Sequence, residues 1–262
     1  MRHQDIRTVV LLGAGNLAWH FGLWFERAGV KVVQVFSRTP SAGEGLAAEL
    51  KTGYTNRLDL LISNADLYLL AVSDDAIHSL VRQSEFGRRF IIHAAGSVPM
   101  EVFAGKLKNF GVLYPLQTFT IGKQLDFNDI PLFIEANNAR NLEKLNVLAH
   151  KLSGRVYTVD SEKRAYLHLA AVIASNFTNH MLAVTDHLLK ERNLSFELLK
   201  PLILETISKA LQMPPIQAQT GPAIRGNLQV IEKHMAILDG HPEIKELYRV
   251  ISESIMRMNS KE

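Results

Sequence analysis

Six residues near the N-terminus have the types and spacing of a turn that binds phosphate groups. Gly13, Gly15 and Ala18 form a G-x-G-x-x-A pattern. In such a turn the first glycine permits a tight bend, the second lets the backbone approach a pyrophosphate, and the small third residue lets helix pack on strand. Free N–H groups at the helix N-terminus then face the phosphates. The pattern predicts a dinucleotide site formed by Gly13, Ala14, Gly15, Asn16 and Leu17.

The end of the second expected strand indicates which dinucleotide binds. NAD-binding proteins usually place Asp or Glu about 20 residues after the glycines, where it accepts hydrogen bonds from the ribose. This chain has Ser37, Arg38 and Thr39 there, and no carboxylate. A guanidinium group and two hydroxyls suit a 2′-phosphate, so the sequence favours NADP. The alternative is a solvated turn with an exposed arginine.

Two further segments follow expected strands. Ligands of parallel α/β sheets bind beyond the carboxyl ends of the strands. Val72 and Ser73 would therefore lie beside the ribose or nicotinamide, and Gly96 and Ser97 could line the reaction site. His93 ends the same strand as the second pair, and a structural role for its ring is at least as well supported as a chemical one.

A polar stripe on an expected long helix supplies candidate groups for proton donation. Reduction of C=O or C=N requires a proton donor or an electrophile beside the acceptor atom. At about 100° per residue, Ser175, Asn179 and Asp186 project within about 20° of His168, and Asn176 lies about 80° away. Hydrogen bonds to a neighbouring helix and a partly buried imidazole explain the stripe equally well. His168 and Asn179 lie about 16 Å apart along the helix axis, too far to contact one substrate atom together. Only residues that are closer to each other on this helix can act on the same atom.

A second cluster, residues 220–227, spans the start of the third expected helix of the C-terminal half. Thr220 could cap that helix, and Pro222 suits its first turn. Arg225 would then project where the helix dipole favours anions, a place that fits a substrate carboxylate. The structural alternative is a helix that starts at proline and packs closely at Gly226.

The first half of the chain alternates strands with helices, which predicts a mainly parallel Rossmann-type sheet. This context, with the glycines between a strand and a helix, favours the dinucleotide interpretation over an ordinary turn. The expected strands are residues 8–12, 32–36, 67–72, 90–93, 112–114, 132–136 and 156–159, and the expected helices are residues 17–28, 41–50, 75–83 (which Asp74 could cap) and 140–152.

The second half shows a helical pattern alone. It predicts helices at residues 162–192, 196–211, 223–238 and 242–258. The fold class is therefore α/β, a Rossmann-type sheet followed by an all-α C-terminal domain. We expect an NADP-binding domain over residues 1–158 and a helical substrate and dimerisation domain over residues 159–262.

The composition of the chain indicates which kinds of binding partner and which cellular compartment to expect. The chain has 262 residues, 47% of them hydrophobic, and a net charge of +3. Without a strongly basic stretch, neither nucleic acid nor a membrane is indicated as a partner. The absence of cysteine excludes thiol chemistry and is compatible with a reducing cytoplasm, where we expect the protein to act. No metal site is expected.

Five motifs together resemble a family of Rossmann-like proteins whose C-terminal half is known as domain of unknown function 2520. The resemblance implies an NADP-binding domain and a helical domain, related to pyrroline-5-carboxylate reductases, ketopantoate reductases and β-hydroxyacid dehydrogenases. It covers nearly the whole chain. The motifs are the glycine turn, His93-x-x-Gly96-Ser97, the segment Tyr114-Pro115-Leu116-Gln117-Thr118-Phe119, His168 with Ala174-Ser175-Asn176-Phe177, and Thr220-Gly221-Pro222-Ala223-x-Arg225-Gly226-Asn227.

One feature of these relatives is missing. Ketopantoate reductases and β-hydroxyacid dehydrogenases use a lysine four residues before an asparagine, and the residue four before Asn176 is Val172. His168 could take the role of proton donor. The relatives commonly form dimers through their helical domains, which implies a homodimer.

The expected function is transfer of a hydride from NADPH to a small carbonyl or imine acid bound between the two domains. His168 would donate the proton, Ser175 and Asn176 would orient the acceptor atom, and Arg225 would pair with a carboxylate. Electron exchange, as in deazaflavin-dependent NADP reductases, is a variant of this chemistry. The missing lysine motivates a different alternative, a non-catalytic NADP sensor or scaffold.

Overall fold

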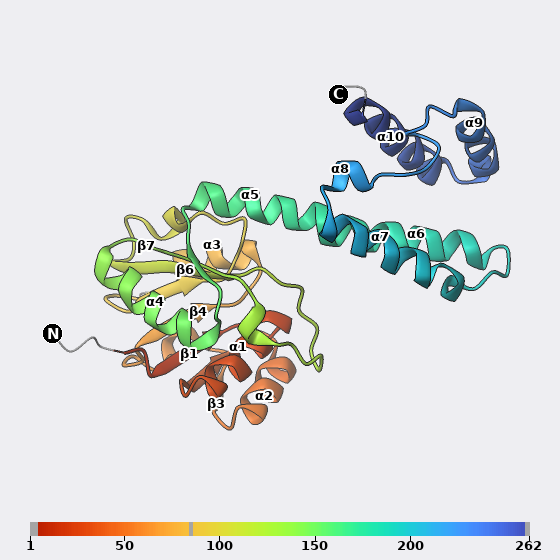
Figure 1. Cartoon of the computed structure of the whole chain (residues 1–262). Helices are drawn as coiled ribbons and strands as arrows, with labels where there is room; N and C mark the ends of the chain where they lie inside the picture. The colour runs from red at the N-terminus through yellow and green to blue at the C-terminus, as the bar shows by residue number, and fades with distance from the viewer. Residues whose placement is uncertain (1–4, 84–85, 260–262) are drawn as a thin grey trace. The chain divides into compact units, whose positions relative to one another are not determined.

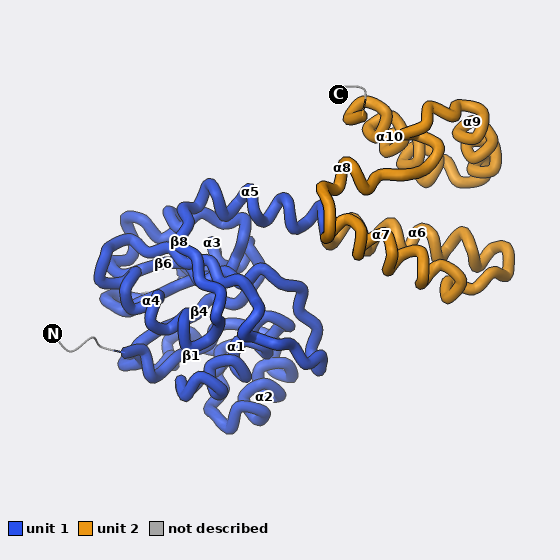
Figure 2. The backbone as a smooth tube through the Cα atoms, viewed as in Figure 1, with its two compact units in different colours: residues 1–174 blue, residues 175–262 orange. Residues whose placement is uncertain are grey.

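The computed structural model describes residues 5–83 and 86–259. Its internal contacts divide the chain into two compact units, residues 1–174 (unit 1) and 175–262 (unit 2), shown in Figure 2. Unit 1 holds a β-sheet with helices on both faces, and the described residues of unit 2 form helices and turns (Figure 1). The predicted fold class, a Rossmann-type sheet followed by a helical region, is confirmed.

Eight strands of unit 1 form one sheet in the order β3-β2-β1-β4-β5-β6-β7-β8. Neighbouring strands run parallel except β6 and β7, which are antiparallel. The sequence pattern did not predict β3, a Gly-Tyr-Thr segment that has no run of apolar or β-branched residues. The strands are β1 (Thr8–Leu12), β2 (Lys31–Phe36), β3 (Gly53–Thr55), β4 (Leu67–Leu70), β5 (Phe90–His93), β6 (Asn109–Pro115), β7 (Leu132–Ala136) and β8 (Val156–Thr158).

Helices cover both faces of the sheet and give it two cores. Alternate residues of a strand point to opposite faces. Val9 and Leu11 therefore pack with α1, α2 and α4, while Val10 and Leu12 pack with α3 and the short 3-10 helix η2. The other two 3-10 helices of unit 1 are η1 (Leu58–Leu60) and η3 (Phe127–Asp129). The bounds are α1 (Asn16–Arg27), α2 (Pro40–Glu49), α3 (Asp74–Gln83), η2 (Met100–Phe103) and α4 (Ala139–Leu152).

The expected helix over residues 162–192 is not one regular helix. α5 (Ser161–Ala171) leads into a π-helical segment, η4 (Val172–Phe177), and α6 (Thr178–Lys190) follows. A π-helical turn takes in an extra residue relative to an α-helical turn. The spacing of about 100° per residue, on which the predicted polar stripe rests, therefore fails through this segment.

The remaining helices of unit 2 include one that begins later than expected. Residues 223–238 were expected to be helical, but α9 starts at Leu228, and Pro222 to Gly226 form turns. Gly221 and Gly226 have φ values of 110° and 63°, which an α-helix does not allow. The bounds are η5 (Phe196–Leu199), α7 (Lys200–Gln212), α8 (Pro215–Ala218), α9 (Leu228–Ile237), η6 (Leu238–Gly240) and α10 (Pro242–Asn259).

No helix in the described part of the chain combines the length and apolar character needed to cross a membrane.

Candidate functional site

The turn between β1 and α1 has a backbone that glycine alone accommodates at residue 13. Gly13 has φ +125°, and its amide donates a hydrogen bond to the Phe36 carbonyl (N···O 2.8 Å). A Cβ on Gly13 would lie 2.1 Å from the carbonyl oxygen of Ala71. The residue thus lets the ends of β1, β2 and β4 come together beneath the turn.

Gly15 opens the N-terminus of α1 to a ligand. It is the N-cap of α1, no side chain caps the helix, and the first turn carries no acidic residue. A Cβ on Gly15 would meet no atom within 4 Å, so the space beside it is open. Uncapped N–H groups and the helix dipole together favour an anion at this place.

A cavity of about 450 Å³ lies over this turn. It gathers ten of the twelve residues that the sequence analysis named as candidate cofactor ligands. Apolar side chains from β2, α2 and α3, with Ala71 directly after β4, complete it. The predicted residues that line it are Gly13, Ala14, Gly15, Asn16, Leu17, Ser37, Arg38, Thr39, Val72 and Ser73.

The segment after β2 forms one wall of this cavity, and its three residues play different parts. The Ser37 hydroxyl donates to the Thr39 carbonyl (3.1 Å) and accepts from the Thr39 amide (3.2 Å), so it shapes the turn. Arg38 is exposed and has no hydrogen-bond or ion-pair partner among residues 5–83 and 86–259. Thr39 is the N-cap of α2, which has neither a capping side chain nor an acidic residue in its first turn. A free guanidinium beside an uncapped helix N-terminus is a favourable place for a phosphate.

Gly96 and Ser97 follow β5 and do not line that cavity. The Ser97 hydroxyl donates a hydrogen bond to a carboxylate oxygen of Asp74. The sequence suggested that Asp74 caps α3 from the position before it, but Asp74 is the first residue of that helix. A Cβ on Gly96 would lie 2.6 Å from the ring of His168. Glycine at position 96 therefore lets the imidazole of α5 approach the end of β5.

His168 is hydrogen-bonded to Tyr114, which the sequence analysis did not name as a site residue. The hydroxyl of Tyr114 on β6 lies 3.1 Å from Nδ1 of His168. Burial raises the pKa of Tyr114, partly offset by the positive charge of Arg164. The hydroxyl therefore stays protonated at neutral pH. It donates to Nδ1 if the imidazole proton is on Nε2, and accepts from Nδ1 if the proton is there. No described residue is bonded to Nε2, so it is free to act on a ligand.

A buried ion pair fixes α5 on the sheet. Arg164 is 1% exposed, forms an ion pair with Glu135 of β7, and donates to the Val98 carbonyl (2.7 Å). Ser161 donates to Glu135 (2.8 Å) and accepts from the Met100 amide (2.9 Å). Arg164 lies one helical turn before His168, so this network sets the position of the candidate proton donor. No spacing in the sequence joins Glu135 to Arg164, and the network was missed.

His93 is buried and packed against other side chains, as expected for a residue with a structural role. The ring is fully buried, its Nδ1 accepts from the Ala95 amide (3.2 Å), and it packs against Phe103 at 5.5 Å between ring centroids. Burial, helped by the positive charge of Arg164, lowers the pKa of His93 to about 3. The imidazole is therefore neutral throughout the physiological range.

The remaining three predicted catalytic residues belong to unit 2. Ser175 and Asn176 lie in the π-helical segment and are exposed. Such segments occur frequently at functional sites. Arg225 is exposed in the turn that precedes α9, not in the first turn of a helix, because the N-cap is Asn227, whose side chain accepts from the Val230 amide (3.2 Å). The expected capping by Thr220 and helix start at Pro222 are therefore wrong.

The fold and the site define a class of protein. The first six strands follow the order 3-2-1-4-5-6, and the glycine turn opens the helix after β1, as in Rossmann dinucleotide-binding domains. The model of the domain of unknown function DUF2520 matches residues 130–255. A solved structure from Bacteroides fragilis, provisionally named an NADP oxidoreductase, is 42% identical with a TM-score of 0.91 over 97% of this chain and 98% of that chain. The chain belongs to this family of Rossmann-like NADP oxidoreductases, as the sequence motifs predicted.

More distant structures share the fold. A reductive aminase from Aspergillus terreus, solved with NADPH and ethyl-5-oxohexanoate, is 14% identical with a TM-score of 0.71 over 97% of this chain and 95% of that chain. A 1-pyrroline-5-carboxylate reductase from Streptococcus pyogenes is 12% identical with a TM-score of 0.61 over 95% and 98%. At these identities the likeness concerns the fold alone. No curated protein matches this sequence significantly.

Proposed function

We propose that the protein is an NADPH-dependent reductase of a small carbonyl or imine compound that carries a carboxylate. The cavity over the glycine turn carries this proposal, because one hollow joins the open helix N-terminus, Arg38 and the end of β4. The reductive aminase, solved with a keto ester, and the pyrroline carboxylate reductase share the fold and support an acceptor of the carbonyl or imine kind.

The preference for NADP over NAD rests on the wall after β2. Arg38 has no described partner and stands beside the uncapped start of α2. Ala42 of the first turn of α2 also lines the cavity. A 2′-phosphate would bind the guanidinium group and the helix N-terminus, whereas the 2′-hydroxyl of NAD would find no carboxylate at Ser37, Arg38 or Thr39.

His168 is the proposed proton donor. When bound, the nicotinamide of the cofactor would supply a hydride to the acceptor carbon. Nε2 of His168 would give its proton to the acceptor oxygen or nitrogen while Nδ1 takes up the hydroxyl proton of Tyr114, so that the imidazole stays neutral. Solvent would then return a proton to Tyr114. Val72, Ser73, Gly96 and Ser97 are proposed to line the nicotinamide and acceptor region.

Ser175, Asn176 and Arg225 are proposed substrate ligands. The first two would orient the acceptor atom by hydrogen bonds, and Arg225 would pair with the carboxylate. We place the domain boundary after residue 158, where the last strand ends, so that the helical domain supplies these residues.

A calorimetric titration with NADPH and with NADH tests the cofactor proposal. We expect the wild-type protein to prefer NADPH, and Arg38→Ala to lose about 10- to 100-fold in NADPH affinity with little change for NADH, since each lost charge-assisted contact costs about 1.5–3 kcal/mol. Arg82→Ala is the matched control, because Arg82 is an exposed arginine of α3 outside the cavity. Equal affinities for the two cofactors in wild type would contradict the NADP proposal.

A kinetic screen of oxo acids and cyclic imines with NADPH tests the reaction. Turnover that is lost in His168→Ala, with cofactor affinity retained, supports catalysis by His168. Cofactor binding without turnover on any acceptor would favour a sensor, and turnover that requires a deazaflavin would favour electron exchange between cofactors.

We further propose that the protein is a homodimer assembled through its helical region. Helices α6, α7 and α9 have no buried side chain. Three leucines of α7 are 63%, 70% and 83% exposed (Leu202, Leu204 and Leu211). An apolar surface of this kind is typical of an interface, and a second copy of the chain would cover it.

A further inference from the structure

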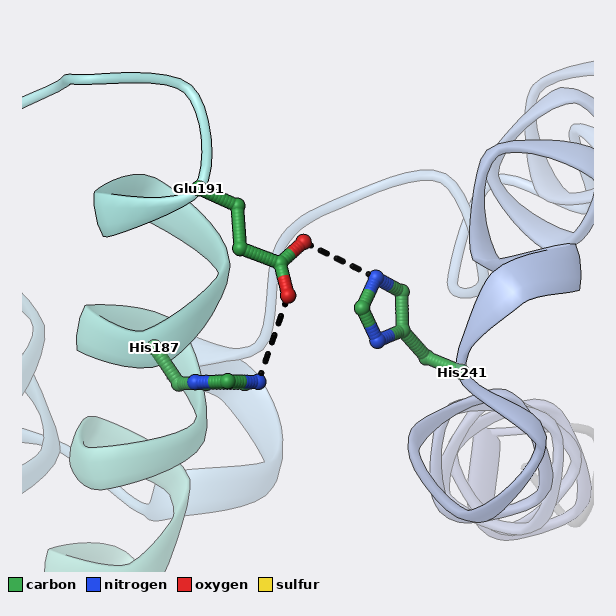
Figure 3. A group of neighbouring side chains, drawn as sticks. All are labelled: His187, Glu191 and His241. Carbon is green, nitrogen blue, oxygen red and sulfur yellow. Dashed lines mark ion pairs between the residues drawn. The ribbon is translucent and has the colours of Figure 1, made fainter.

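Three side chains with metal-binding chemistry converge within unit 2, as Figure 3 shows. His187 and Glu191 stand one turn apart at the C-terminal end of α6, and His241 immediately precedes α10. The ligand atoms of the three residues all lie within 4.8 Å of one another. The sequence analysis expected no metal site, and the fold alone brings His241 to the other two residues.

The spacing of the ligand atoms, at most 4.8 Å, lets all three residues reach one small ion after small side-chain adjustments. Nε2 of His187 lies 3.4 Å from one carboxylate oxygen of Glu191, and Nε2 of His241 lies 3.0 Å from the other. Ligands about 2.0–2.1 Å from a tetrahedral zinc ion are about 3.4 Å apart. Two imidazole nitrogens with one carboxylate are a frequent zinc ligand set that leaves a fourth position for water. The described residues offer no fourth protein ligand within the group.

We propose that His187, Glu191 and His241 bind one divalent cation of the zinc class. The ion ties the end of α6 to the start of α10 and thereby stabilises unit 2. Few residues of this unit are buried, among them Ala223, Leu238 and Ser252. A metal bridge between two of its helices therefore contributes a larger share of its stability than it would in a domain with a large hydrophobic core. The group is open to entry of an ion, since the side chains of His187 and His241 are 62% and 25% exposed.

A plain ion-pair network is the competing explanation. Exposed pairs of this kind contribute about 0–1 kcal/mol and need no metal. The two explanations differ in what they predict for added metal, because an ion pair between Glu191 and a protonated imidazole has no use for zinc, whereas ligation displaces the proton.

Titration of the chelator-treated full-length protein with zinc chloride tests the proposal. Calorimetry should show one ion per chain, and cobalt chloride should give a visible absorption band of tetrahedral type. Saturating zinc should raise Tm by roughly 5 °C. His241→Ala should lower zinc affinity at least tenfold and abolish the cobalt band, while His180→Ala, an exposed histidine of the same helix, should leave both unchanged.

The unfolding curves of both variants without metal show whether each is folded, so a loss of binding in a folded His241→Ala protein is specific. Absence of zinc binding to wild type, or the same zinc affinity in wild type and His241→Ala, would overturn the proposal. No cofactor or substrate enters these measurements, so their result is independent of the proposed oxidoreductase function.

Discussion

At the scale of single residues, the contact between Tyr114 and His168 makes the first prediction. A protonated Tyr114 hydroxyl should fix His168 as the tautomer with its proton on Nε2. Long-range ¹⁵N NMR correlations of the imidazole measure this directly. We expect Tyr114→Phe to mix the two tautomers and to lower kcat about tenfold, with the Kd for NADPH unchanged.

Tyr157→Phe is the control for this change, since Tyr157 is a half-exposed tyrosine of β8. A wild-type His168 that carries its proton on Nδ1 would reverse the direction of the hydrogen bond and remove Tyr114 from its positioning role.

Also at the residue scale, His93 should make the stability of the protein depend on pH. The pKa of His93 is about 3 in the folded protein and has the ordinary value of 6.5 in the unfolded chain. Between these two pH values, His93 is protonated in the unfolded chain and neutral in the folded protein. Stability from this group is present above pH 6.5 and is lost as the pH falls toward 3. Between pH 7 and pH 5 the loss is about 2 kcal/mol.

Urea unfolding at these two pH values, in wild type and His93→Asn, measures this loss. Other groups contribute alike to both proteins, so the variant should show about 2 kcal/mol less dependence on pH. Identical pH dependence in the two proteins would show that the buried ring is protonated with little penalty.

At the scale of elements, the turn between β1 and α1 separates a folding effect from a binding effect. Gly13→Ala drives a Cβ into the Ala71 carbonyl at a φ of +125°, so the variant should be destabilised by about 2–4 kcal/mol. Gly15→Ala meets no atom and has an ordinary φ of −85°. It should change the free energy of unfolding by less than about 1 kcal/mol and yet weaken NADPH binding more than tenfold, because the methyl group would occupy the space proposed for the pyrophosphate.

Urea unfolding and calorimetry on the same preparations give both quantities. Unimpaired binding of NADPH by a folded Gly15→Ala protein would place the phosphates elsewhere.

At the scale of the whole molecule, the apolar surface of α7 predicts the state of assembly. Light scattering after size-exclusion chromatography should give about twice the chain mass of 29.3 kDa. The double change Leu204→Glu and Leu211→Glu places two charges on one helix face and should shift the protein to monomers. Leu60→Glu is the control, because Leu60 is 55% exposed in unit 1. A wild-type monomer at tens of micromolar would contradict the homodimer.

The sequence by itself determined the features that depend on neighbouring residues. The glycine turn was predictable because a tight bend and an open helix N-terminus are demands on the local backbone, which Gly13 and Gly15 meet. The alternation of apolar strands with amphipathic helices specified the parallel sheet, and Arg38 identified the wall after β2.

The tertiary structure alone decided which distant residues meet. Tyr114 lies beside His168, and Glu135 beside Arg164, because the fold packs α5 against β6 and β7. The spacing of these residues in the sequence does not predict that they meet. The π-helical turn at Val172–Phe177 and the late start of α9 escaped prediction for a similar reason. Hydrophobic periodicity assumes a constant rotation per residue, and one extra residue in a turn, or a glycine with positive φ, breaks that assumption without changing the composition.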